Sequence, residues 1–120
     1  MKVLVVDDSK VMRKIVVRTL RQAGFDEVDV VEADDGADGL SKVTAERPDL
    51  ILSDWNMPNL TGIEFLVSLR ASGNATPFGF VTSEGSNEMR ERAAAAGALF
   101  LIAKPFSSET FADALSPVLT

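Results

Sequence analysis

The residues best suited to chemistry follow short apolar runs at four separate places in the chain. They comprise three carboxylates, a hydroxyl and an amine: Asp7, Asp8, Asp54, Thr82 and Lys104. Clustered carboxylates repel one another, so a bound cation or raised pKa values must relieve them. Mg²⁺ prefers oxygen ligands, and an amine and a hydroxyl can donate to oxygens that carry developing negative charge. Such a set suits phosphoryl transfer with a carboxylate as the nucleophile.

Each of these residues also has an ordinary structural explanation when it is taken alone. An aspartate behind a strand, such as Asp8, is often the N-cap of the next helix. Thr82 alone fits a turn residue, and Lys104 alone fits a surface lysine. Phosphoryl transfer nevertheless explains the five residues better as a group, because four separate segments supply side chains that are chemically compatible.

Apolar runs alternate with segments of helical periodicity, which defines the elements that must position these side chains. Short, mainly apolar runs predict strands at residues 3–6, 28–31, 50–52, 78–81 and 99–103, and the run at 3–6 is continuous and β-branched. Helical spacing predicts helices at about 12–23, 37–43, 63–69, 87–96 and from Ser108 onward. Asp8 or Ser9 is the expected N-cap of the first helix. Pro117 is expected to kink the last helix or end it early.

This alternation predicts the fold class. Strands joined by helices must be parallel, with right-handed crossovers. We therefore predict a doubly wound α/β fold, in which a five-stranded parallel sheet and five helices form a three-layer, flavodoxin-like sandwich, with one domain over residues 1–120. The carboxyl ends of all strands share one edge of such a sheet, and ligands bind there at the switch point in strand order. The five polar residues should converge at that edge.

Composition excludes several other classes of protein. The chain contains no histidine and no cysteine, which removes His-dependent triads and the usual zinc sites. Neither of the common glycine-rich nucleotide-binding motifs is present. A net charge of −6 disfavours direct contact with nucleic acid. The apolar run after Lys2 is too short for a signal peptide, and no run could span a membrane, so we expect a cytoplasmic protein.

Four segments together resemble the receiver domains of two-component response regulators, and the resemblance extends over essentially the whole chain. The segments are Val5-Val6-Asp7-Asp8-Ser9, the stretch from Asp54 to Gly62, Val81-Thr82-Ser83-Glu84 and Lys104-Pro105-Phe106. The stretch from Asp54 to Gly62 is especially similar to chemotaxis (CheY-like) receivers. The resemblance implies a phosphoacceptor switch that takes a phosphoryl group from a histidine kinase or phosphotransfer protein and then changes its binding to a downstream protein target.

The resemblance also implies a role for each site residue. Asp54 would be the phosphoacceptor, and Lys104 and Thr82 would contact the phosphoryl oxygens. The Mg²⁺ ion would be held by Asp7, Asp8, Asp54 and the backbone carbonyl of Asn56. The side chains of Asn56 and Glu84 would tune autodephosphorylation, and the Lys104-Pro105 peptide bond would be cis.

Leu101 departs from the family pattern, which usually has Tyr, Phe or His three residues before the lysine. Phe100 is adjacent in sequence, but a shift of one residue points to the other face of a strand. The usual coupling between hydroxyl and aromatic ring therefore lacks its ring here. We expect phosphorylation to shift loop and helix populations through Thr82 instead.

Two other classes of protein fit parts of the pattern. A small aspartate-dependent phosphohydrolase would usually carry a second aspartate two residues past the nucleophile, where this chain has Asn56. A non-phosphorylated interaction domain would keep the fold without the chemistry, and the full acidic set with Lys104 counts against it.

Overall fold

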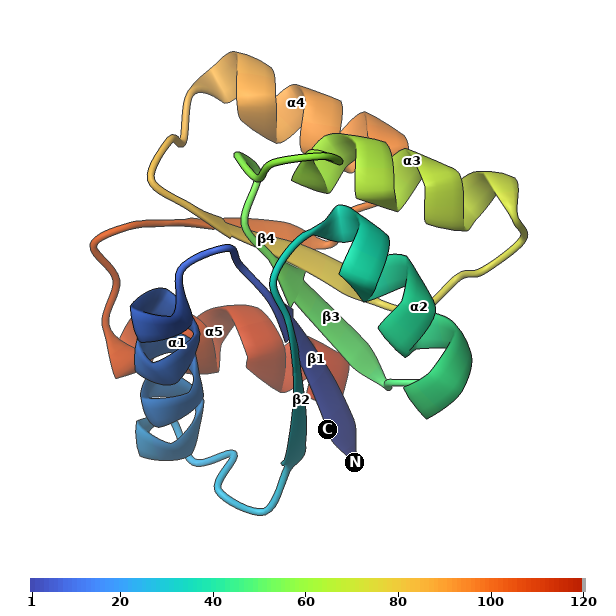
Figure 1. Cartoon of the computed structure of the whole chain (residues 1–120). Coiled ribbons are helices and arrows are strands. Elements are labelled where there is room, and N and C mark those ends of the chain that lie inside the picture. Colours follow the sequence, from blue (N-terminus) through green and yellow to red (C-terminus); the bar gives the residue numbers. More distant parts are fainter. Residues whose placement is uncertain (120) are drawn as a thin grey trace.

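The computed structural model describes residues 1–119, which form five strands and five helices in strict alternation (Figure 1). The strands are β1 (Lys2–Val6), β2 (Asp29–Ala33), β3 (Leu50–Ser53), β4 (Phe78–Thr82) and β5 (Phe100–Ala103). The helices are α1 (Lys10–Gln22), α2 (Gly36–Glu46), α3 (Gly62–Ala71), α4 (Asn87–Ala96) and α5 (Ser108–Leu119). Within this part of the chain, none of the helices has the length and apolar character that crossing a membrane requires.

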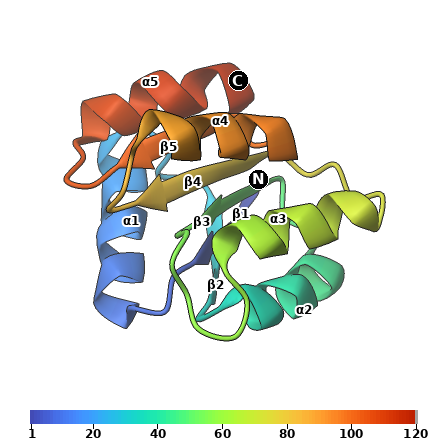
Figure 2. The ribbon, with the colours of Figure 1, turned by 90° about the horizontal axis from the view of Figure 1, so that it is seen from above.

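All strand pairs are parallel, and the sheet order is β2-β1-β3-β4-β5. Helices α1 and α5 cover one face of the sheet, and α2, α3 and α4 cover the other (Figures 1 and 2). The doubly wound α/β fold predicted from the sequence is therefore confirmed. Strand order reverses between β1 and β3, which places the switch point where those two strands end.

The sheet separates two apolar cores, because alternate side chains of a strand point to opposite faces. Leu4, Val6 and Ile51 face the side of α2, α3 and α4. Val3, Val5 and Leu52 face the side of α1 and α5. Residues of both cores on the central strands are almost fully buried, which explains why these strands read as continuous apolar runs in the sequence.

One predicted strand boundary was wrong, and one of the two effects expected at Pro117, an early end of the helix, does not occur. The strand expected at 28–31 lies at Asp29–Ala33, because β2 is an edge strand whose exposed Glu32 still pairs in the ladder with Val5. The last helix does not end early at Pro117 but continues to Leu119. Proline leaves the carbonyl oxygen four residues earlier without its helical donor. That residue is Asp113, which is exposed, so water can satisfy the carbonyl.

Candidate functional site

Backbone hydrogen bonds that continue the sheet beyond the strand ends hold the predicted site residues. The amide of Asp7 donates to the Ala33 carbonyl oxygen at 3.1 Å, and the amide of Asp54 donates to the Val6 carbonyl oxygen at 2.9 Å. The amide of Lys104 donates to the Thr82 carbonyl oxygen at 2.8 Å. These bonds fix Asp7, Asp54 and Lys104 at the same edge of the sheet.

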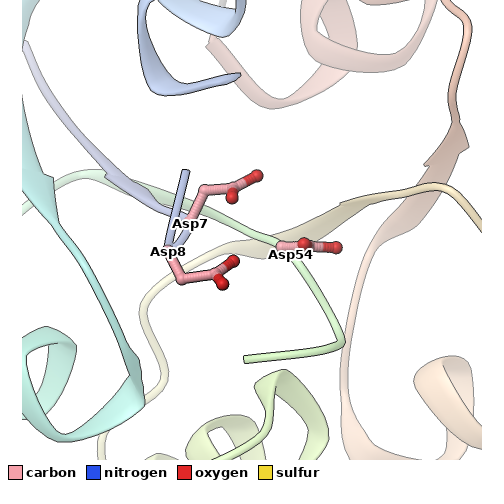
Figure 3. Close-up of side chains that lie close together, drawn as sticks. All are labelled: Asp7, Asp8 and Asp54. Carbon is pink, nitrogen blue, oxygen red and sulfur yellow. The ribbon is translucent and has the colours of Figure 1, made fainter. Parts of the chain in front are cut away.

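Three carboxylates gather at the switch point. Asp7, Asp8 and Asp54 each place a carboxylate oxygen within 4.8 Å of the others. Figure 3 shows their carboxylates extending to the same side of the β1 and β3 ends. The cap of α1 is Ser9, whose side chain accepts from the Met12 amide, so Asp8 is not occupied as an N-cap. This acidic triad could hold a metal ion, as the sequence predicted.

Lys104 provides a cationic group between two of these carboxylates. Its Nζ lies 3.4 Å from Asp7 Oδ2 and 3.7 Å from Asp54 Oδ2. The Lys104-Pro105 peptide bond is cis, as the resemblance implied. One lysine cannot balance three neighbouring carboxylates, so the cluster as a whole favours binding of a further cation.

The environment of Asp54 favours its neutral form. Burial raises the pKa of the Asp54 carboxyl group above its ordinary value, and the charge of Asp7 raises it further. The charge of Lys104 opposes this shift, as do the Trp55 amide and the Thr82 hydroxyl. The ionised Asp54 carboxylate therefore lowers the free energy of unfolding at pH 7.

This destabilisation predicts a pH-dependent effect of Asp54→Asn on stability. Because the folded state has the higher pKa, it binds more protons, and stability falls as pH rises from the unfolded pKa through the folded pKa. In EDTA at pH 7, the variant should be more stable than the wild type. Urea titrations at several pH values measure the difference, which should shrink at acidic pH, where Asp54 is protonated in both states. An equal difference at pH 7 and below pH 4 would contradict the assignment.

Thr82 completes the arrangement on the β4 side. Its side chain is fully buried, and its Oγ1 accepts from the Glu84 amide at 3.4 Å. The turn expected from the ordinary explanation of Thr82 is therefore present, and it places the hydroxyl beside Asp54. The contact of Thr82 with a phosphoryl group stays a prediction.

The loop after β3 is shaped by a close approach to Asp54. A side chain at Gly62 would clash with the Asp54 carbonyl oxygen, and the Gly62 amide donates to the Trp55 carbonyl oxygen at 2.8 Å. Asn59 takes a positive φ of 67°, and its side-chain amide donates to Asp35 Oδ2 at 2.8 Å. Gly62 shapes this loop, and Asn59 anchors it to the cap of α2.

Asn56 lies outside the acidic cluster with an exposed side chain. Its amide donates to Glu84 Oε1 at 3.3 Å, so the two residues named for tuning dephosphorylation contact each other. The role of the Asn56 carbonyl as a metal ligand stays a prediction.

Leu101 and Phe100 lie on opposite faces of the sheet, as predicted. Leu101 is buried in the core on the α4 side. The Phe100 ring packs with the core on the α5 side and lies across Gly79 of the paired strand, where a side chain on Gly79 would clash with it. Phe100 is therefore held in place and does not substitute for an aromatic ring at position 101.

Sequence reasoning missed two features next to the site. The Arg13 guanidinium donates to the Asp7 carbonyl oxygen at 2.6 Å and to Glu32 at 2.9 Å. An apolar groove also borders Lys104, and it is lined by Met12, Ile15, Lys104, Pro105 and Phe106. Met12 and Ile15, which are apolar and three residues apart, were the available sequence signal for this groove, because residues at that spacing share one face of a helix.

Comparisons with known proteins agree with this geometry. The family model described as "Response regulator receiver domain" matches residues 3–116. The Pseudomonas aeruginosa chemotaxis protein CheY is 35% identical over 98% of this chain and 95% of its own length. Chemotaxis protein CheY-3 of Vibrio cholerae is 38% identical over 98% of this chain and 91% of its own length.

Solved structures agree as well. Vibrio cholerae CheY4 superimposes with a TM-score of 0.85 at 41% identity, covering 98% of each chain. A signalling role, rather than that of a true enzyme, follows from these relationships. The chain belongs to the response regulator receiver domain family.

Proposed function

We propose that this protein switches by accepting a phosphoryl group on Asp54 from the phosphohistidine of a partner. The observation that carries the proposal is the Asp54 carboxylate beside Asp7, Asp8 and the Lys104 ammonium at one sheet edge. An Asp54 oxygen forms the new bond to phosphorus, the bond from phosphorus to the histidine nitrogen breaks, and the imidazole leaves with the electron pair. Lys104 and Thr82 donate to the phosphoryl oxygens as charge develops there.

We further propose Mg²⁺ as the ion that the acidic triad binds. The donors are all oxygens. Burial, together with the charge of Asp7, raises the pKa of the Asp54 carboxyl group, so a cation bound beside it would stabilise the ionised form. Asp7, Asp8 and Asp54 would hold the ion with the Asn56 carbonyl. When bound, Mg²⁺ supplies positive charge that neutralises phosphoryl oxygens.

The wild-type protein provides the direct test. Incubation with acetyl phosphate and Mg²⁺ should add one phosphoryl group, detected by intact mass spectrometry and localised to the peptide that contains Asp54. Trp55 is the only tryptophan in the sequence and is adjacent to Asp54, so its fluorescence should respond to Mg²⁺. An unmodified protein, or a group localised elsewhere, would refute the proposal, and turnover of a phosphomonoester would indicate a phosphohydrolase.

The partner should approach over the apolar groove between α1 and the loop before α5. This groove includes Ile15 and Phe106 and borders Lys104, so a partner seated there could present its phosphohistidine to Asp54. The surrounding face of α1 is basic, with Lys10, Lys14 and Arg18 exposed. A partner with apolar and acidic side chains around its histidine would complement this surface.

Ile15→Asp should affect phosphotransfer from the partner but not modification by acetyl phosphate. We expect phosphotransfer from the partner to slow about tenfold or more, because a charge enters the apolar contact. The rate with acetyl phosphate should stay unchanged, since that small donor needs no docking surface. Val67→Asp is the matched control, because Val67 is an exposed apolar residue on α3, on the opposite layer of the fold. Equal slowing with both donors would contradict the docking surface.

We also propose that the protein acts in chemotaxis. Relatives named as chemotaxis proteins support a role in chemotaxis in the cytoplasm. The phosphorylated protein would then bind a target protein differently from the unmodified one.

A further inference from the structure

Arg90 connects three segments near the site through its guanidinium group. Its Nη1 donates to the Leu101 carbonyl oxygen at 2.9 Å, and its Nε donates to the Gly85 carbonyl oxygen at 3.3 Å. Leu101 lies in β5, and Gly85 lies in residues 83–86, which we term the β4–α4 loop. One side chain of α4 thus ties this loop to the neighbouring strand.

The β4–α4 loop starts directly after Thr82, so its position affects the group beside Asp54. The Glu84 amide donates to Thr82 Oγ1 at 3.4 Å, and Asn56 donates to the Glu84 carboxylate at 3.3 Å. Gly85 is the next residue, and it is the one that Arg90 holds. A short chain of contacts therefore runs from Arg90 through the loop to the hydroxyl of Thr82.

The loop packs closely at Gly85. A side chain carbon added there would lie 3.1 Å from Ala103 Cβ and 3.3 Å from Arg90 Nη2. Arg90 also lines a hollow of about 220 Å³ together with Leu101 and Ala94. The guanidinium therefore has a close contact with the loop and space into which it can move.

We infer that Arg90 is a positioning residue that restrains phosphorylation of Asp54, an inference that rests on the proposed function. A phosphoryl group adds charged oxygens next to Thr82, where Lys104 Nζ is now only 3.7 Å from Asp54 Oδ2. Thr82 and the β4–α4 loop must adjust to these oxygens, and Gly85 then leaves Arg90. Because Arg90 bonds to the backbone carbonyl of Leu101, the restraint needs no aromatic side chain at that position.

The test compares Arg90→Met and Arg90→Lys with the wild type. Beryllofluoride with Mg²⁺ imitates the aspartyl phosphate, and Trp55 fluorescence reports its binding. Arg90→Met should bind beryllofluoride about three- to tenfold more tightly, because the loop loses the hydrogen bond at Gly85 and the link through Arg90 to the Leu101 carbonyl in β5. Arg90→Lys should lie between Arg90→Met and the wild type, since lysine can donate to one of the two carbonyls. The rate of modification by acetyl phosphate, measured by mass spectrometry, should rise in the same order.

Arg21→Met, which removes an exposed arginine of α1 that also donates to a backbone carbonyl, that of Asp26, should leave the affinity unchanged. Gly85→Ala provides a second route if Arg90→Met does not fold, because the added carbon crowds Arg90 without removing it. It should also tighten beryllofluoride binding, and combining it with Arg90→Met should add little. Unchanged or weaker binding in the Arg90 and Gly85 variants would overturn the inference. Failure of the wild type itself to bind beryllofluoride would instead overturn the proposed function.

Discussion

Asp54→Asn is expected to take up no phosphoryl group from acetyl phosphate in the presence of Mg²⁺. The reaction needs an anionic oxygen that can form an acyl phosphate, and a neutral amide provides a far weaker nucleophile. The asparagine side chain has nearly the same shape, and we expect the variant to be at least as stable as the wild type because burial and Asp7 raise the pKa of Asp54. Loss of the adduct would then reflect chemistry rather than unfolding.

Intact mass spectrometry after a fixed incubation measures this result. The matched control is Asp113→Asn, which removes an exposed carboxylate of α5 and should be modified as the wild type is. An adduct of the same mass and yield on Asp54→Asn would show that another residue is the acceptor.

Lys104→Met is expected to slow modification by acetyl phosphate about 100-fold or more, the usual effect of removing one donor aimed at a developing charge. Lys104 Nζ lies 3.7 Å from Asp54 Oδ2, so a phosphoryl group on that oxygen comes within its reach. Its side chain is mostly buried, with 17% of its surface exposed, and water would replace its charge poorly.

Binding of Mg²⁺ separates this effect from damage to the metal site. Lys104 lies 3.4 Å from Asp7 Oδ2 and competes with any cation for the same carboxylates, so the variant should bind Mg²⁺ as tightly as the wild type or more tightly. Lys42→Met removes a half-exposed lysine that pairs with Asp38 on α2 and should alter neither rate nor binding. If Lys104→Met reacts at the wild-type rate, Lys104 takes no part in the reaction.

Much of the fold and the site could be predicted from the sequence because two simple rules apply. Central parallel strands are buried on both faces, so they read as unbroken apolar runs such as Leu50–Leu52. The chain leaves each strand at the same edge of the sheet, so the residues after Val6, Ser53 and Ala103 must meet there. The predicted convergence of Asp7, Asp54 and Lys104 followed from these rules alone.

The remaining features depend on contacts between residues far apart in sequence. Edge strand β2 buries less of its surface than the central strands. Because Glu32 is charged and exposed, the apolar pattern ended at Val31, and the sequence did not predict that the strand continues to Ala33. Arg13 and Arg90 were missed because an arginine that donates to a backbone carbonyl on another element has no local sequence pattern. Glycine is a poor helix former, yet Gly39 lies inside α2 because a side chain there would collide with the Phe65 ring of α3, a constraint that only the packed helices reveal.

The Phe100 ring lying across Gly79 has a consequence for how this sequence can diverge. The two residues face each other in the parallel register of β4 and β5, and any side chain at position 79 would occupy the space of the ring. Neither position can therefore change freely while the other is kept. In a set of related sequences, a larger residue at position 79 should occur together with a smaller one at position 100.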